Sequence, residues 1–107
     1  MQIIEAPNGK QHLTVLAPEF AAQFEVYGCQ PVQGFGEVHG RDLYFRAKYD
    51  EWSFEVADRN GNMPSDGFHD SDGYYVERPY LNAGYMPHRE AVLLIEQSLR
   101  AYTDARR

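Results

Sequence analysis

Residues 34–58 read GFGEVHGRDLYFRAKYDEWSFEVAD, and this stretch decides the fold. Residues of high β propensity alternate here on both sides of two polar breaks, a pattern typical of a three-stranded antiparallel meander. The two breaks, Gly40-Arg41 and Asp50-Glu51, are the predicted two-residue loops. A loop of defined length sets the pairing register of the two strands that it joins.

The two predicted loops agree on a single apolar face. The first places Val38 opposite Leu43 and Gly36 opposite Phe45. The second places Tyr49 opposite Trp52, Ala47 opposite Phe54 and Phe45 opposite Val56. Both registers assign the same residues to the apolar side, namely Val38, Leu43, Phe45, Ala47, Tyr49, Trp52, Phe54 and Val56. The other side carries Glu37, Tyr44, Arg46, Lys48, Ser53 and Glu55, with Arg46 directly opposite Glu55. A one-residue slip would scramble this division, so the agreement supports the sheet.

The N-terminal third predicts one hairpin and one short helix. Residues 2–5 and 11–16 are β-like runs on either side of the turn signal at 7–9, which indicates a hairpin. Pro18 suits a first helical position, and aromatic residues follow it at helical spacing. A short helix is therefore expected over residues 18–27, with a strand over 23–29 as the alternative.

The C-terminal half predicts a long loop and then a helix. Residues 59–87 are rich in glycine, proline and tyrosine, and are expected to form a loop with one short strand at 74–77. From Pro87 to about Thr103, an apolar stripe at helical spacing comprises Val92, Ile95, Leu99 and Tyr102. The predicted fold is one α+β domain over residues 1–107. In it, an antiparallel sheet of three to five strands packs against the C-terminal helix.

The charge of the chain restricts its partners. The net charge is −6, which argues against non-specific binding to nucleic acid or to an anionic membrane surface. Residues 51–80 alone carry seven acidic and two basic residues. The expected partner is therefore a protein with a basic surface.

Cysteine usage and hydropathy point to an intracellular protein. Cys29 is the single cysteine, which excludes an internal disulfide framework, and it is expected to be a buried structural residue. The N-terminal residues lack the pattern of a signal peptide, and no apolar run approaches membrane-spanning length. The expected location is the cytoplasm.

The closely spaced aspartates raise the question of a metal site. Asp66, Asp70 and Asp72 are oxygen ligands of the kind that calcium takes, but neither aspartate run fits the EF-hand spacing. An acidic, solvated loop is therefore favoured over an irregular calcium site, and no metal or other cofactor is predicted.

No catalytic motif stands out in the chain. It contains no nucleophile elbow, phosphate loop, dinucleotide fingerprint or paired-histidine motif, so the protein is not expected to be an enzyme. Two alternatives stay open. One is a small metal-dependent enzyme that uses His69, Asp70 and Asp72, and the other is a regulatory domain with a ligand pocket between sheet and helix.

The tyrosines of the long loop suggest an interface. Tyrosine offers a large contact area and a hydroxyl at low entropy cost, and it is enriched at the centres of protein interfaces. Nucleic-acid modules interleave such rings with Lys and Arg, whereas here the neighbours are acidic. The predicted partner-binding residues are Asp66, Phe68, Asp70, Asp72, Tyr74, Tyr75, Glu77, Tyr80 and Tyr85.

The stretch GEVHGRDLYFRAKYDEWSFEV at residues 36–56, followed by AGYMPHREAVLLIE at residues 83–96, resembles a family of small uncharacterised bacterial and phage proteins. The shared pattern is a G-x-x-x-G turn leading into YFRA, then WS, and finally AGYMP before a helix, and it spans residues 36–96. This resemblance implies no activity. By size, acidity and lack of catalytic motifs, the chain also resembles phage-encoded inhibitors of the anti-CRISPR type. That likeness implies an inhibitor that occupies a nucleic-acid-binding surface of its partner.

Overall fold

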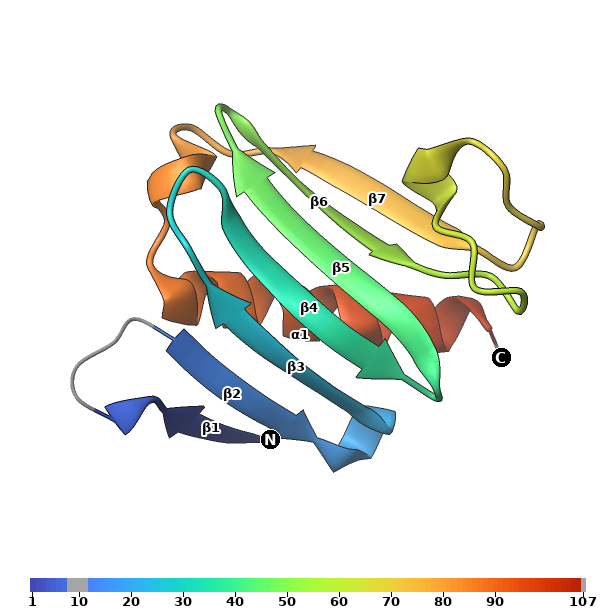
Figure 1. The fold of residues 1–107 in the computed structure, drawn as a ribbon, viewed down its shortest axis with the longest axis horizontal. Coiled ribbons are helices and arrows are strands. Elements are labelled where there is room, and N and C mark those ends of the chain that lie inside the picture. The colour runs from blue at the N-terminus through green and yellow to red at the C-terminus, as the bar shows by residue number, and fades with distance from the viewer. Residues whose placement is uncertain (8–11, 107) are drawn as a thin grey trace.

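A computed structural model describes residues 1–7 and 12–106 as a seven-stranded antiparallel sheet with one α-helix across one face (Figure 1). Each strand pairs with its neighbours in sequence, so the strand order is β1 to β7. The strands are β1 (Gln2–Glu5), β2 (His12–Ala17), β3 (Ala22–Tyr27), β4 (Val32–Val38), β5 (Arg41–Lys48), β6 (Glu51–Val56) and β7 (Tyr74–Pro79). The helix is α1 (His88–Ala105), and three 3₁₀ turns are η2 (Pro18–Phe20), η3 (Pro64–Asp66) and η4 (Ala83–Tyr85).

The α+β class and the C-terminal helix are confirmed, but the expected number of strands is wrong. The predicted N-terminal hairpin is present as β1 and β2. Of its predicted turn, Pro7-Asn8-Gly9, the last two residues lie outside the described residues. The strand expected at 74–77 is β7, which extends the meander by one more antiparallel pair. None of the helices in residues 1–7 and 12–106 is long and apolar enough to cross a lipid bilayer.

The short helix expected over residues 18–27 is wrong. Its first residues form only the single turn η2, and the rest forms β3. Ala22, Phe24 and Val26 alternate with polar residues and point inward, a two-residue period that overrode the helical spacing of the aromatics. Pairing with β2 on one side and β4 on the other satisfies both edges of β3. The alternative strand over 23–29 is thus the better prediction.

Both hairpin turns of the central meander lie earlier than predicted. Val38 pairs with Arg41 and Lys48 pairs with Glu51, so the two-residue loops are His39-Gly40 and Tyr49-Asp50. His39 and Gly40 both have positive φ, the backbone of a type I′ turn, whose twist matches the flanking strands. The predicted pairing partners are therefore wrong by two residues.

A shift of two residues preserves the side on which each side chain lies. The predicted apolar face is accordingly buried, except for Tyr49, which sits in a turn and is 72% exposed. The predicted pairing of Arg46 with Glu55 is wrong, because Arg46 pairs with Ser53 and Glu55 pairs with Tyr44.

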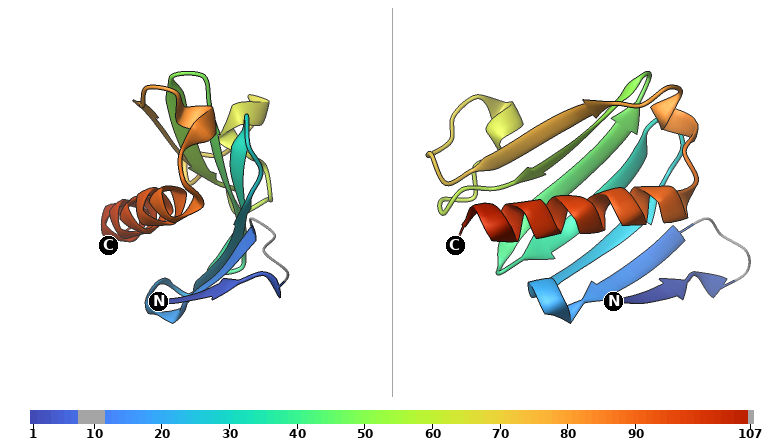
Figure 2. Two further views of the ribbon diagram at one scale, coloured as in Figure 1. Left: turned by 90° about the vertical axis from the view of Figure 1, so that its left-hand side faces the viewer. Right: turned by 180° about the vertical axis from the view of Figure 1, so that it is seen from behind.

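The core lies between this face and α1, as Figure 2 shows in the edge-on view. The predicted helix stripe of Val92, Ile95, Leu99 and Tyr102 is fully buried against the sheet. Trp52 is also buried, and its ring stacks on Phe45 with centroids 5.7 Å apart. Burial of these large rings and branched chains is the main stabilising contribution to the fold.

Candidate partner-binding surface

The face of the sheet opposite α1 is covered by no α-helix in the described part of the chain, and only the 3₁₀ turn η3 lies at one end of it (Figure 2). We call the outward residues of β2 to β7 the open face. They are His12, Thr14, Leu16, Gln23, Glu25, Tyr27, Gln33, Phe35, Glu37, Asp42, Tyr44, Arg46, Lys48, Glu51, Ser53, Glu55, Tyr75, Glu77 and Pro79. Six are acidic, and only Arg46 and Lys48 are Lys or Arg. The open face is therefore strongly acidic.

Aromatic rings follow one register row across the open face. Phe35 on the middle strand β4 pairs with Tyr44 on β5, and Tyr75 lies on the edge strand β7 in the same row. Phe35 is 49% exposed and Tyr75 is 45% exposed. Aromatic side chains that are half exposed on a rigid sheet are of the type that contributes most of the binding free energy in protein interfaces.

The two tyrosines of this row are neutral at physiological pH. Tyr44 donates its hydroxyl hydrogen bond to Gln33 Oε1 at 2.9 Å, and Tyr75 donates to Glu77 Oε2 at 2.8 Å. Burial raises the pKa of Tyr44 above its ordinary value, although Arg46 opposes the shift. Burial, followed by the hydrogen bond to Glu77, raises the pKa of Tyr75. The phenols therefore add contact area and hydrogen bonds but no charge.

The loop 57–73 folds back onto one end of the open face through η3. Glu55 is only 3% exposed, because its carboxylate accepts hydrogen bonds from the Ser65 backbone N–H at 2.9 Å and from the Ser65 hydroxyl at 2.7 Å. Glu55 therefore does not face Arg46, and its contact with Ser65 fastens η3 to β6. The loop and the open face form one continuous surface.

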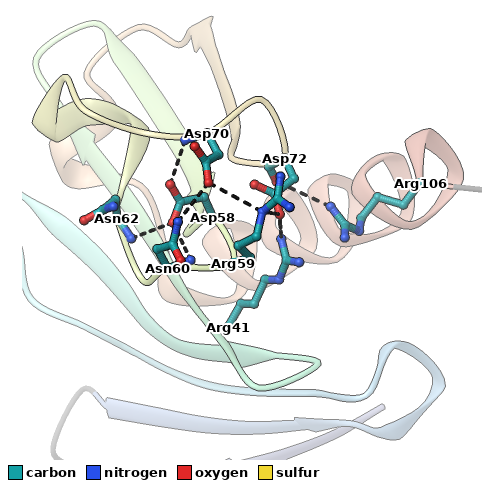
Figure 3. Close-up of polar contacts among 8 residues, drawn as sticks. All are labelled: Arg41, Asp58, Arg59, Asn60, Asn62, Asp70, Asp72 and Arg106. Carbon is teal, nitrogen blue, oxygen red and sulfur yellow. Dashed lines mark hydrogen bonds and ion pairs between the residues drawn. The ribbon is translucent and has the colours of Figure 1, made fainter.

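Asp58 organises the rest of this loop (Figure 3). Its Oδ1 accepts the backbone N–H groups of Asn60 and Asn62 at 2.8 and 2.9 Å, and its Oδ2 accepts that of Asp70 at 2.7 Å. These hydrogen bonds, that of Asp70 first, lower the pKa of Asp58 below its ordinary value. Asp58 is therefore charged at neutral pH and holds two distant parts of the loop together.

Asp70 and Asp72 lie beside Asp58 and form ion pairs with arginines (Figure 3). Arg41 on β5 approaches Asp72 Oδ2 at 3.1 Å, and Arg59 lies 3.4 Å from Asp70 and 3.5 Å from Asp72. Arg106, the residue directly after α1, donates to the Asp72 carbonyl at 3.4 Å. We call Asp58, Asp70, Asp72, Arg41 and Arg59 the loop clasp, because they hold the loop together and tie it to β5 of the sheet.

The loop clasp has one feature of a cation site, since its three aspartates can bring one carboxylate oxygen each within 4.8 Å of one another. Asp72 Oδ1 is also buried without a hydrogen-bond partner in the described part of the chain. Against this, both oxygens of Asp58 accept N–H groups, and two guanidinium groups already neutralise the other aspartates. His69 does not belong to the group of possible ligands found among the described residues.

The structure divides the predicted partner-binding residues among different places. Asp66 and Phe68 are exposed on the loop, Phe68 at 86%, and Tyr75 and Glu77 are exposed on the open face. Asp70 and Asp72 belong to the loop clasp.

The other three predicted tyrosines lie elsewhere. Tyr74 packs edge-on between Phe54 and Tyr102, and Tyr80 is partly buried against the core. Tyr85 lies on η4, near the opposite end of β7 from the loop (Figure 1), and it accepts a hydrogen bond from Gln30.

Sequence reasoning missed Phe35 as a surface residue, although a signal for it exists. The predicted meander places Gly36 and Val38 on alternate positions of β4, with Val38 inward, so Phe35, directly before Gly36, has to point outward. The notable feature is an aromatic residue on a side otherwise occupied by acids and amides. Glu25 and Tyr27 were missed because β3 was expected to be helical.

A groove lies between the N-terminal end of α1 and the nearby end of the sheet, where the alternative of a regulatory domain places its ligand pocket. It has a volume of about 600 Å³ and is lined by Leu13, Val32, Cys29, His88 and Arg89 among others. Cys29 is exposed there, so the prediction of a buried cysteine is wrong. The His88 ring nitrogen Nε2 hydrogen-bonds the Gly28 carbonyl at 2.8 Å rather than activating the thiol.

Comparisons with known proteins do not add to this description. No family model matches the chain, and no curated protein or solved structure is significantly similar to it.

Proposed function

We propose that this protein is a non-enzymatic binding protein whose open face, together with the exposed residues of the adjoining loop, binds a basic surface of a partner protein. The observation that carries the proposal is the combination of five exposed acids, Glu25, Glu37, Asp42, Glu51 and Glu77, with half-exposed Phe35 and Tyr75 on a rigid seven-stranded sheet. Complementary charge steers the encounter, and desolvated aromatic rings supply the short-range affinity.

The charge favours a protein partner over nucleic acid or membrane. Both phosphate backbones and anionic lipid surfaces are attracted by Lys and Arg, of which the open face has only two. The same charge would repel a second copy of the open face. A basic protein surface is the complementary occupant.

A more specific form of the proposal concerns the ligand that normally binds the basic surface of the partner. Protein surfaces that hold nucleic acid are rich in Lys and Arg, so a rigid acidic face can occupy them. The protein would then act as an inhibitor of a nucleic-acid-binding protein, in the manner of phage anti-CRISPR proteins. Addition of duplex or single-stranded nucleic acid should displace this protein from its partner, and failure to compete would contradict the inhibitor role.

The test of the general function is a capture experiment with matched variants. Immobilised wild type is compared with Phe35→Ala and with Leu93→Ala, because Leu93 lies on α1 and is 48% exposed, close to the 49% of Phe35. A partner of the open face is retained by wild type and by Leu93→Ala and is lost from Phe35→Ala. Equal capture by all three proteins would place the interface elsewhere and reject the proposal.

A further inference from the structure

We propose that the centre of the open face receives an arginine side chain of the partner, stacked on the ring of Phe35 and paired with the carboxylates around it. This inference rests on the proposed function and makes its partner specific. It predicts which cation is recognised and which residue of this chain recognises it.

Phe35 occupies the geometric centre of the open face. It lies at the middle of β4, which is the middle strand of the seven. Its ring is half exposed although three strands flank it on each side. Energetically dominant contact residues cluster near the centres of interfaces, where surrounding contacts exclude water.

Three carboxylates lie beside this ring, and one cation, Arg46, lies diagonal to it on β5. Glu25 pairs directly with Phe35, Glu37 follows two residues later on β4, and Asp42 pairs with Glu37 and so lies diagonal to Phe35. Directly paired side chains have Cβ atoms about 5 Å apart, and diagonal ones about 7–8 Å. A cation within about 6 Å of the ring centre therefore lies within reach of these carboxylates.

The three carboxylates differ in the hydrogen bonds and ion pairs that they already make within the chain. Glu25 is 3.0 Å from His12 Nε2, and Glu37 accepts a long 3.5 Å hydrogen bond from Gln23. The Asp42 side chain is exposed and has no hydrogen-bond or ion-pair partner among the described residues. Asp42 and Glu37 are thus the carboxylates most available to an incoming cation.

The ring of Phe35 is itself available. Elsewhere this chain places Arg100 over Phe20 at 5.3 Å and Arg106 over Tyr102 at 5.1 Å, and Lys48 lies over Tyr49. None of the cation–π contacts in residues 1–7 and 12–106 involves Phe35. The open face therefore presents a solvent-facing ring with acids around it and no cation of its own on top.

Arginine suits this arrangement better than lysine. Its planar guanidinium stacks on an aromatic ring while its N–H groups bond carboxylates at the edge, and it is less strongly hydrated than an ammonium group. Lysine can neutralise the carboxylates, but its ammonium group cannot stack flat on the ring while it hydrogen-bonds carboxylates at its edge. A preference for arginine is therefore the signature of this site.

Two labelled octapeptides, one of arginine and one of lysine, provide the probe. Their charges are equal, so binding through net charge alone gives equal affinity. The site predicts that the arginine peptide binds about two- to fivefold more tightly by fluorescence anisotropy, as expected for an exposed cation–π contact. Amide shifts in NMR spectra of the labelled protein should centre on Phe35 and its neighbours.

Variants separate the arginine site from the general function. Phe35→Leu keeps an apolar side chain but lacks the ring, and should reduce the arginine affinity to that of lysine; Leu93→Ala should preserve the difference. Equal binding of both peptides to wild type would contradict the arginine site. If the double variant Glu37→Gln, Asp42→Asn then weakens both peptides alike, the proposed function, binding to a basic surface, is still supported. Binding of neither peptide also overturns the arginine site, and the capture experiment then decides the function by itself.

Discussion

At the scale of single residues, two glycines determine how closely β4 approaches its neighbours. A Cβ atom on Gly36 would overlap the carbonyl oxygen of Gln23 and lie 2.5 Å from the Cα of Phe24, both backbone atoms of β3. A Cβ atom on Gly34 would instead lie 2.7 Å from Cδ1 of Ile95, the end of a side chain on α1. Backbone atoms of a paired strand cannot move aside, whereas a side chain can change rotamer.

We therefore expect Gly36→Ala to be more destabilising than Gly34→Ala. Overpacking by one methyl group at Gly34 should cost about 1–3 kcal/mol, and the same change at Gly36 should cost more or prevent folding. Urea denaturation followed by circular dichroism measures both. A smaller loss of stability at Gly36 than at Gly34 would contradict the close approach of β3 and β4.

Among the aromatic residues of β6, truncation of Trp52 is expected to cause the largest loss of stability. It is 8% exposed and stacks on Phe45 within the core. Trp52→Ala should lower the free energy of unfolding by about 3–5 kcal/mol, because it removes apolar burial and leaves a cavity. Phe68→Ala is the control, since Phe68 is 86% exposed, and should change stability by no more than about 0.5 kcal/mol. Equal losses in the two variants would reject the assigned core.

At the scale of elements, the loop 57–73 is ordered by polar contacts rather than by an apolar core. Asp58 gathers three backbone N–H groups, Ser65 binds Glu55, and Arg41 and Arg106 connect the loop to β5 and α1. The partners come from segments up to 34 residues apart. The stability of this loop should accordingly depend on charge, and the stability of the sheet and α1 on packing.

The loop clasp predicts an acid-dependent loss of stability. The folded-state pKa of Asp58 lies below its ordinary value of 3.8, so its contribution is complete above that pH. The contribution is lost as the pH falls from there through the lower folded-state value. Asp58→Asn should lower the melting temperature at pH 7 and reduce the fall in melting temperature below pH 4. An unchanged acid profile in thermal melts of the variant would show that Asp58 does not contribute in this way.

Calcium is expected to bind the loop clasp weakly or not at all. Arg41 and Arg59 already compensate the aspartates, and Asp58 has hydrogen bonds to both oxygens. A ligand that binds the native state must raise its melting temperature. We expect no shift in thermal melts with millimolar calcium. A rise of several degrees that disappears in Asp72→Asn would overturn this prediction.

At the scale of the whole molecule, the charges lie unevenly with respect to the sheet. The open face holds six of the acidic residues of a chain with net charge −6, while the C-terminal part from residue 81 has three acids and four bases. Long-range attraction to a basic partner should therefore act through the open face. Asp70 and Asp72, predicted as contact residues, are poor probes of it because they also hold the loop.

Neutralising the open face should slow association with the captured partner. Glu37→Gln with Asp42→Asn removes two charges from the open face, and Glu90→Gln with Glu96→Gln removes two from α1. The first variant should lower the association rate and its dependence on salt, since electrostatic steering is screened by ions; the second should lower both less. Surface plasmon resonance at two salt concentrations measures this. Equal effects of the two variants would mean that only net charge matters.

The local pattern of the sequence was enough to predict which residues face the core. Strict alternation over β5 and β6 and the stripe of α1 follow from periods of 2 and 3.6, which depend only on neighbouring residues. The tertiary structure decided the rest. It set each turn one residue earlier, which shifts the pairing partners by two, because His39 and Gly40 take up the left-handed backbone that suits the sheet twist. It made β3 a strand because two neighbouring strands complete its hydrogen bonds.

Some features of the open face can be predicted from the sequence alone, and others depend on the tertiary structure. The acidity and aromatic content of the chain, and the outward direction of Phe35, can be derived from the sequence alone. The assembly of Glu25, Phe35, Asp42 and Tyr75 into one face requires the order of four strands, and the loop clasp requires Arg41, Asp58 and Asp72 to meet from separate elements. Local pattern carries no information about such long-range neighbours, because the free energy that selects them comes from packing and pairing of the whole sheet.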